Sequence, residues 1–276
     1  MPARLPMDLH CHSENSYDAS HSVYAMCEAA IRSKIDVLAI TDHYEISALE
    51  VNFAEWDAGL EKSLAETRSA RERFKGRLVV LTGIEIGQPL EKLSKAEEIQ
   101  GSHSFDIVLG SLHNAPGRLD MYFMPDHADQ GFFDRELEAY FANLYELVRW
   151  GGFDCAAHIT YPFRYIMERK VKDFSFRRWD DHVEAIVRVI AEKGLALEIN
   201  TSGVEKTPSH TLPDVRWVKR FRELGGENIT LGGDAHRPES VGRGIEEGVR
   251  IAAEAGFTRL CYYMERKPCY VSLSEF

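Results

Sequence analysis

The chain has 276 residues, 44% of them hydrophobic, and a formal net charge of −11. This length is large for one average domain but usual for an α/β barrel, so we expect residues 1–276 to form a single domain. The acidic charge argues against nonspecific binding of nucleic acid or of an anionic membrane, because most of the surface would repel phosphate groups. The acidic net charge is still compatible with a small anionic substrate that is held by a local basic pocket and by metal ions.

The sequence shows no membrane span and no export signal. No apolar stretch approaches the roughly 20 residues needed to cross a bilayer, and residues 1–6 lack the apolar region of a secretory signal. The five cysteines are an odd number and contain no Cys-x-x-Cys pair, which is typical of reduced thiols. We therefore expect a cytoplasmic protein.

Short apolar runs alternate with amphipathic stretches along the whole chain. The runs predict strands at 5–9, 35–40, 78–81, 105–109, 153–157, 195–199 and 229–231. The stretches have helical period and predict helices at 23–34, 56–74, 132–150, 179–193, 212–224 and 241–255. This alternation predicts a parallel sheet covered by helices on both faces. Residues 114–131 are too long for an ordinary connection and predict a lid or a surface excursion.

Each predicted strand ends in a polar residue that can bind or position a ligand. The residues at these ends are His10 and His12, Asp42 and His43, Glu85, His113, His158, Asn200, and Asp234 with His236. In a barrel the C-terminal ends of all strands face one mouth, whereas an open sheet collects ligands mainly at its switch point. The pattern therefore predicts a closed barrel with a metal site at those ends.

The candidate ligands are imidazoles and carboxylates. His10 and His12 are two residues apart on a strand, so both side chains project to the same face and can hold one ion. One histidine near a strand end is more often structural, but the joint placement of this set favours ligation. Such ligands suit zinc, iron and manganese, and their chemistry does not indicate which of the three metals is bound. The nine candidates are His10, His12, Asp18, His43, Glu85, His113, His158, Asp234 and His236.

The motifs that contain these residues resemble those of the PHP (polymerase and histidinol phosphatase) superfamily of metal-dependent phosphoesterases. The likeness covers essentially the whole chain and is carried by Asp8-Leu9-His10-Cys11-His12-Ser13, Ile40-Thr41-Asp42-His43 and Gly232-Gly233-Asp234-Ala235-His236. Residues 13–18, 83–87, 158–165 and 198–203 are most similar to the L-histidinol-phosphate phosphatases of that superfamily. Asp18 carries weight because many relatives of other function have histidine there.

The resemblance implies a fold, a metal centre and a reaction. The fold is a distorted (β/α)7 TIM-like barrel, and the reaction is hydrolysis of L-histidinol phosphate to L-histidinol and inorganic phosphate in histidine biosynthesis. The nucleophile would be a metal-bridging hydroxide, because metals lower the pKa of bound water from ~15.7 toward ~7. Three ions are implied: the first held by His10, His12, Glu85 and Asp234, the second by Glu85, His113 and His158, and the third by Asp18, His43 and His236.

Substrate contacts are also implied by the resemblance. Arg164, in the loop after His158, would bind phosphate oxygens with its planar fork. The second basic contact of the family is missing from its usual place after residues 200–203, so either Lys206 or Arg237 replaces it or the contact is absent. The imidazole pocket has three candidates, Tyr17, Tyr44 and Tyr161.

The sequence leaves two possible roles for Asp42. It would either protonate the leaving group, a task that metal-bound water could also perform, or orient His43 without binding metal.

Two other functions remain open. The first is a phosphoesterase of the same superfamily that acts on nucleotides or on other small phosphomonoesters. The second is a metal-binding scaffold or regulatory domain without catalysis, which the full set of nine ligands disfavours. A panel of phosphorylated substrates separates the three.

Overall fold

The computed structural model describes residues 6–46, 52–125, 128–172 and 174–275. Seven parallel strands follow one another around a barrel in chain order, and an eighth short strand, β3 (His43–Glu45), pairs with the end of β4. The seven are β1 (Met7–Asp8), β2 (Val37–Ile40), β4 (Val79–Gly87), β5 (Ile107–Ser111), β6 (Cys155–Ala156), β7 (Ala196–Asn200) and β8 (Ile229–Gly232).

The first and last strands meet and nearly close the barrel. The backbone amide of Leu9 donates to the carbonyl of Leu231 at 2.9 Å, and Cys11 forms a parallel bridge with Ala235. All seven predicted strands are present, so the predicted distorted (β/α)7 barrel is confirmed. Glu85 lies inside β4, because this strand runs six residues beyond the predicted end.

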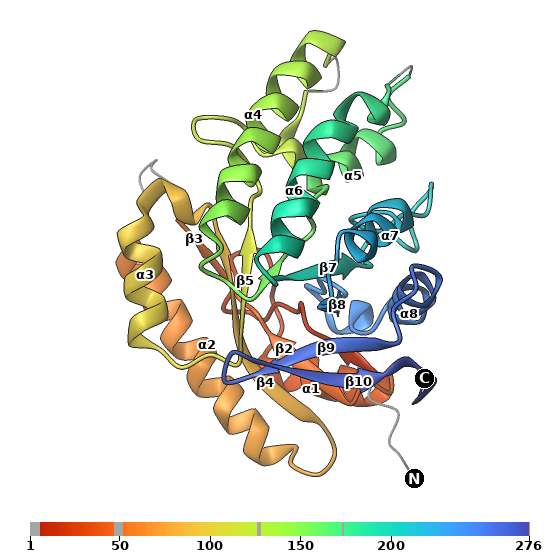
Figure 1. Cartoon of the computed structure of the whole chain (residues 1–276). Helices are drawn as coiled ribbons and strands as arrows, with labels where there is room; N and C mark the ends of the chain where they lie inside the picture. Colours follow the sequence, from red (N-terminus) through yellow and green to blue (C-terminus); the bar gives the residue numbers. More distant parts are fainter. Residues whose placement is uncertain (1–5, 47–51, 126–127, 173, 276) are drawn as a thin grey trace.

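Helices surround the barrel (Figure 1). They are α1 (Val23–Arg32), α2 (Phe53–Arg73), α3 (Leu93–Ser102), α4 (Gln130–Trp150), α5 (Tyr161–Glu168), α6 (Asp180–Glu192), α7 (Val215–Glu223) and α8 (Ile245–Glu254). Short 3-10 turns are η1 (Pro89–Lys92), η2 (Met121–Phe123), η3 (Phe176–Trp179), η4 (Pro238–Ser240) and η5 (Leu273–Glu275). Within the described residues, no helix is both long and apolar enough to cross a bilayer.

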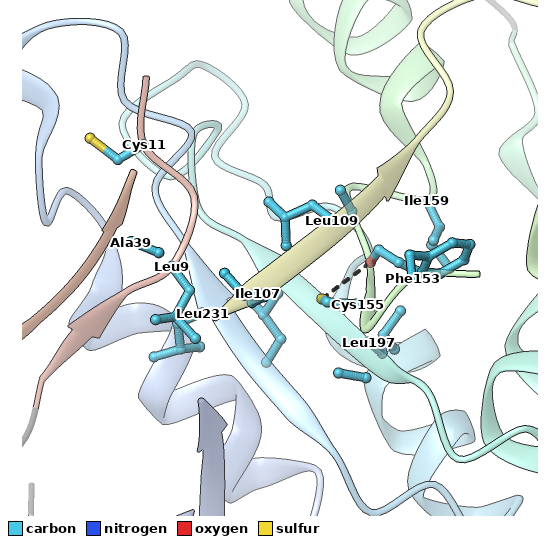
Figure 2. Packing of buried hydrophobic residues seen from close by; sticks show 14 of the residues in the cluster. Leu9, Cys11, Ala39, Ile107, Leu109, Phe153, Cys155, Ile159, Leu197 and Leu231 are labelled. Carbon is cyan, nitrogen blue, oxygen red and sulfur yellow. Dashed lines mark hydrogen bonds between the residues drawn. The ribbon is translucent and has the colours of Figure 1, made fainter. Parts of the chain in front are cut away.

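Burial on both faces explains the near-continuous apolar strands. Every residue of β2, β5, β7 and β8 is buried, and their apolar side chains belong to one core with the inner faces of the helices. Figure 2 shows part of this core, with Leu9 and Leu231 at the seam of the barrel. The strand ends are thereby held on a rigid frame.

Two helices and one hairpin were missed by the sequence patterns. Helix α3 buries only three side chains, so its apolar period is weak. Helix α5 has eight residues and begins with Tyr161-Pro162, where proline suits a first turn. The hairpin of β9 (Arg259–Met264) and β10 (Lys267–Ser272) turns at Glu265 and Arg266, both with positive φ. Such turns usually carry asparagine and glycine, so the sequence gives no signal for it.

The hairpin covers the end of the barrel opposite the candidate site. The amide of Arg266 donates to the Asp106 carbonyl at 2.9 Å, and the Arg266 guanidinium pairs with Asp154 at 2.9 Å. Asp106 and Asp154 begin the chain segments that lead into β5 and β6, so these contacts cap the strand starts (Figure 1).

Candidate metal centre

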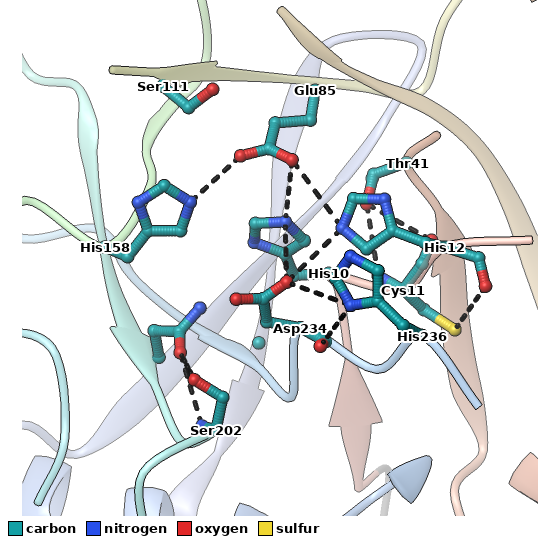
Figure 3. A network of polar contacts seen from close by, with 12 residues as sticks. His10, Cys11, His12, Thr41, Glu85, Ser111, His158, Ser202, Asp234 and His236 are labelled. Carbon is teal, nitrogen blue, oxygen red and sulfur yellow. Dashed lines mark hydrogen bonds and ion pairs between the residues drawn. The ribbon is translucent and has the colours of Figure 1, made fainter. Parts of the chain in front are cut away.

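The strand ends bring the six predicted histidine ligands into one cluster. The His12 ring lies 4.2 Å from the rings of both His43 and His236, measured between centroids. The His10 and His158 rings are 5.5 Å apart, and those of His113 and His158 are 5.3 Å apart. Glu85 and Asp234 approach His10 and His12 from opposite sides (Figure 3).

The first group of ligand atoms has the spacing of a tetrahedral site. His10 Nε2 lies 3.2 Å from Glu85 Oε2 and 3.7 Å from Asp234 Oδ1. For His12 Nε2 the same distances are 3.6 and 3.4 Å. Ligand atoms bound about 2.1 Å from a tetrahedral ion lie roughly 3.4 Å from one another. His10, His12 and Asp234 thus form one candidate group for an ion, and Glu85 lies beside both histidines.

The other oxygen of Glu85 belongs to a second group. Glu85 Oε1 lies 2.9 Å from His158 Nε2 and 3.3 Å from His113 Nε2. A carboxylate that offers one oxygen to each of two groups can bridge two ions. Glu85 thus contacts both groups, one with each carboxylate oxygen, and its bridging of two ions stays a prediction.

A third group lies on the far side of His12. Asp18 Oδ2 is 3.0 Å from His236 Nε2 and 3.6 Å from His43 Nε2. His43 turns its other nitrogen, Nδ1, to within 2.8 Å of Glu85 Oε2. His43 therefore connects the third group to the bridging carboxylate.

The buried ligand atoms lack partners of their own. His10 Nε2, His12 Nε2 and Glu85 Oε2 are buried and make no hydrogen bond, a costly state for polar atoms unless an ion satisfies them. Burial lowers the pKa of His10, yet Glu198 and Glu85 outweigh it and raise that pKa well above the usual value. Burial raises the pKa of Glu85, but His10 and His43 hold it well below the usual range. The pocket is thus built for positive charge, and its residues fit divalent metals.

Two carboxylates that sequence reasoning missed fix the orientation of ligand histidines. Glu198 Oε1 lies 2.8 Å from His10 Nδ1, and Glu45 Oε1 lies 3.0 Å from His113 Nδ1. An ionised carboxylate only accepts, so each Nδ1 carries a proton, and each Nε2 is the nitrogen that offers a lone pair once the ring is neutral, as a ligand histidine must be. The Glu198 motif was noticed only through the family resemblance, and Glu45 had no signal beyond its place after Asp42-His43.

Asp42 holds the loop between His12 and Asp18. It accepts hydrogen bonds from the Ser13 amide at 2.5 Å and hydroxyl at 2.7 Å, and from the hydroxyls of Ser16 at 2.9 Å and Ser63 at 2.5 Å. The Ser16 hydroxyl in turn lies 3.2 Å from His12 Nδ1.

Both Asp42 oxygens accept from serine donors, and its part in leaving-group protonation stays a prediction. It orients His12 through Ser16, and it does not contact the side chain of His43.

The motif of residues 232–236 has glycines where neighbouring side chains come close and a strained backbone at Asp234. A Cβ at Gly232 would overlap Glu198 Oε1 and His10 Cβ, and a Cβ at Gly233 would lie 2.6 Å from Asp8 Oδ2. Asp8 accepts from the Gly233 amide at 2.7 Å. Asp234 follows with φ 53°, a conformation that costs a non-glycine residue energy and that clusters at functional sites.

Arg164 reaches the cluster from helix α5, not from a loop as predicted. Its guanidinium lies 3.3 Å from Asp234 Oδ2, 3.4 Å from Asn200 Oδ1 and in contact with the Ser202 hydroxyl. The two candidates for a second basic contact lie farther out. Lys206 is half exposed and pairs with Glu168 at 3.7 Å, and Arg237 is exposed beside His236.

The three candidate tyrosines lie in different places. Tyr17 is 67% exposed, and its ring centroid lies 5.2 Å from that of His43, so it borders the mouth. Tyr161 is buried beside the His113 and His158 rings, at 5.2 Å from each. The expectation for Tyr44 is wrong: it is fully buried, and its hydroxyl donates to Asp57 in α2 at 2.6 Å.

Comparison with known proteins gives consistent results. The PHP domain family model matches residues 8–202. The probable histidinol-phosphatase of Thermotoga maritima is 30% identical over 258 residues, 92% of this chain and 94% of the relative. That of Clostridium acetobutylicum is 26% identical over 255 residues, 90% and 93% of the two chains.

A solved structure has the same fold. The crystal structure of histidinol phosphate phosphatase from Lactococcus lactis, complexed with zinc, L-histidinol and phosphate, superposes with a TM-score of 0.80 at 22% identity and covers 96% of this chain and all of that one. The family match covers most of the chain and runs from the end of β1 to just past β7. The protein therefore belongs to the PHP domain family.

Proposed function

We propose that this protein is a metal-dependent phosphomonoesterase that hydrolyses L-histidinol phosphate to L-histidinol and inorganic phosphate. The observation that supports this proposal is the cluster of nine candidate ligands: eight of them fall into groups whose ligand atoms lie within 4.8 Å of one another, and Asp18 lies 3.0 Å from His236. The assignment of the substrate rests on relatives that are named histidinol-phosphatases and that match this chain along nearly their whole length. Five free thiols fit a cytoplasmic setting.

We further propose that the centre takes three ions. The first would be held by His10, His12, Glu85 and Asp234, the second by Glu85, His113 and His158, and the third by Asp18, His43 and His236. Zinc, the metal in the Lactococcus lactis structure, suits these ligands, as iron and manganese do. Bound ions would supply Lewis acidity, which activates water at neutral pH and neutralises phosphoryl charge.

The residues around the metals would bind and orient the substrate. The Arg164 side chain is largely buried; burial lowers the pKa of its guanidinium, but Asp234 outweighs this and raises the pKa above its usual value. It would therefore remain cationic and grip two phosphate oxygens. Phosphoryl transfer depends mostly on such positioning and charge stabilisation.

The alcohol end of the substrate would lie toward the mouth of the barrel. Tyr17 offers an exposed ring face beside His43 on which an imidazole can stack. Tyr161 borders the opposite side, next to His113. Lys206 and Arg237 would contact the phosphate together with Arg164 only after their side chains turn inward.

The test is phosphate release by protein loaded with zinc, iron or manganese. We expect kcat/KM for L-histidinol phosphate of about 10⁴ M⁻¹s⁻¹ or more, well above the values for p-nitrophenyl phosphate and a nucleotide panel. Activity confined to nucleotides would keep the metal chemistry and replace the substrate. Absence of activity on every phosphomonoester would favour a binding scaffold.

A further inference from the structure

The segment between β5 and α4 places one carboxylate, that of Asp120, against Tyr161, whose ring borders the metal centre. Asp120 caps the short turn η2, where its Oδ1 accepts from the Tyr122 amide at 2.8 Å. Both of its oxygens lie 3.1 Å from the hydroxyl of Tyr161. Arg169 fixes the same segment by donating to the carbonyls of Met124 and Tyr122 at 2.5 and 3.1 Å. Asp120 is therefore held in place against α5.

Tyr161 lies between this carboxylate and the phosphate-binding group. Its ring centroid is 5.2 Å from the rings of His113 and His158 and 5.6 Å from Arg164 Cζ. Its hydroxyl end meets Asp120. A basic group and an acidic group thus flank the same tyrosine at the edge of the cluster, with Arg164 on one side and Asp120 on the other.

The charge of Asp120 has no lysine or arginine partner within the described chain, and His113, whose positive charge acts on it, becomes neutral when it binds metal. The donors that Asp120 accepts from are a phenol and an amide, both neutral, and no described lysine or arginine pairs with it. An asparagine would cap η2 and accept from Tyr161 equally well. A partly buried anion near a phosphate site is unfavourable for binding a dianionic ester, unless the substrate brings a cation to it.

We propose that Asp120 binds the cationic amino group of the substrate while Arg164 binds its phosphate. The substrate class is a phosphomonoester whose ammonium group lies a few bonds from the ester oxygen. This inference rests on the proposed function, because L-histidinol phosphate carries its ammonium on the carbon next to the one that bears the ester oxygen. Asp120 then selects against nucleotides and other esters that lack a cation in this place.

The test compares two substrates in the Asp120→Asn variant. These are L-histidinol phosphate and its analogue 3-(imidazol-4-yl)propyl phosphate, which lacks only the amino group. A charge-assisted hydrogen bond contributes enough that its loss should lower kcat/KM for L-histidinol phosphate roughly 10- to 100-fold, mainly through KM. For the analogue we expect no loss or a gain. Equal losses for both substrates would make Asp120 a structural anchor and overturn the proposal, as would unchanged kinetics.

Two controls separate charge from fold. Asp134→Asn removes a carboxylate that pairs with Arg178 on the exposed face of α4, and should leave both substrates unaffected. Inhibition by inorganic phosphate should be unchanged in Asp120→Asn, whereas inhibition by L-histidinol should weaken. Wild-type activity confined to nucleotides would overturn the proposed function and this inference with it. Preference for L-histidinol phosphate with an unaltered Asp120→Asn variant would overturn this inference alone.

Discussion

The carboxylate of Glu198 lies 2.8 Å from Nδ1 of His10, on the side of the ring that faces away from the metal cluster. Its other oxygen accepts from the backbone amide of His158 at 2.7 Å. One buried side chain in β7 therefore positions ligands from two other parts of the barrel. The metal geometry depends on this contact as well as on the ligands.

Replacing Glu198 with glutamine should weaken metal binding. The amide keeps the size of the side chain but removes the charge that holds the His10 proton on Nδ1. Loss of such a partner typically costs 10- to 100-fold in metal affinity, and we expect a loss in that range, measured by competition with a chelator. Glu227→Gln, at an exposed pair with Arg259, is the matched control. Equal affinity in both variants would remove Glu198 from this role.

Alanine at Gly232 should damage the same contact. The added methyl group would overlap Glu198 and His10, and overpacking of this kind costs roughly 1–3 kcal/mol of unfolding free energy. We expect a lower midpoint of thermal unfolding together with reduced metal content. The control is Gly101→Ala in α3, where a Cβ meets nothing within 4 Å and the helix should gain stability. Normal metal content in Gly232→Ala would contradict the close approach seen here.

Arg164 should contribute mainly to catalysis, because its guanidinium lies beside Asp234 at the edge of the cluster and we propose that it binds the phosphate. We expect Arg164→Ala to lower kcat/KM roughly 10²- to 10³-fold, the usual effect of removing one preorganised charge-stabilising donor. Lysine should restore only part of this loss, since it lacks the planar fork. Steady-state kinetics on metal-saturated protein gives the answer, with Arg178→Ala as the control on the outer surface. An Arg164→Ala variant with wild-type kinetics would exclude the assigned role.

Metal binding should release a proton from His113. Burial lowers the pKa of His113, but Glu45 and Glu85 outweigh it and raise that pKa to about 10. In the metal-free protein the charged ring therefore stabilises the fold fully below its unfolded pKa of about 6.5, and this contribution is lost as the pH rises toward 10. A ligand histidine must be neutral, so metal binding at pH 8 displaces the proton.

Glu45→Gln should reduce the number of protons released. Removing this carboxylate lowers the pKa of His113, so less of the ring is protonated at pH 8 before metal binds. Calorimetric titration with metal in buffers of different ionisation enthalpy counts the protons. Glu61→Gln, which removes the carboxylate 3.0 Å from His103 Nε2, should match the wild type. The same count in Glu45→Gln would show that Glu45 does not set the protonation of His113.

The ligands could be predicted from the sequence because they follow local patterns. His10, Glu85 and Asp234 each lie on or just past a strand, and parallel strands bring their C-terminal ends together. The carboxylates that orient the ligands carry no such pattern. Glu198 is one buried glutamate in an apolar strand. Its contact with His10 forms only because the fold places β7 across from β1. Asp42 follows its strand as a ligand would, but three serines surround it in the fold.

The substrate contacts were harder to predict because they depend on short or irregular segments. Arg164 was expected on a loop, since eight residues with one proline give little helical period, yet it projects from α5. Tyr44 is adjacent to a ligand in sequence, but strand alternation turns it outward to α2. Asp120 lies in a segment of 18 residues between predicted elements, where nothing in the pattern indicates which side chain turns inward.

The most direct test of the account is to titrate metal into chelator-stripped protein while following phosphate release from L-histidinol phosphate. We expect no activity without metal, a rise with added zinc or manganese, and saturation near three equivalents per chain. Glu85→Gln, which loses the bridging carboxylate, should stay near background at every loading. Full activity in the stripped protein, or none with L-histidinol phosphate at any loading, would contradict the assignment.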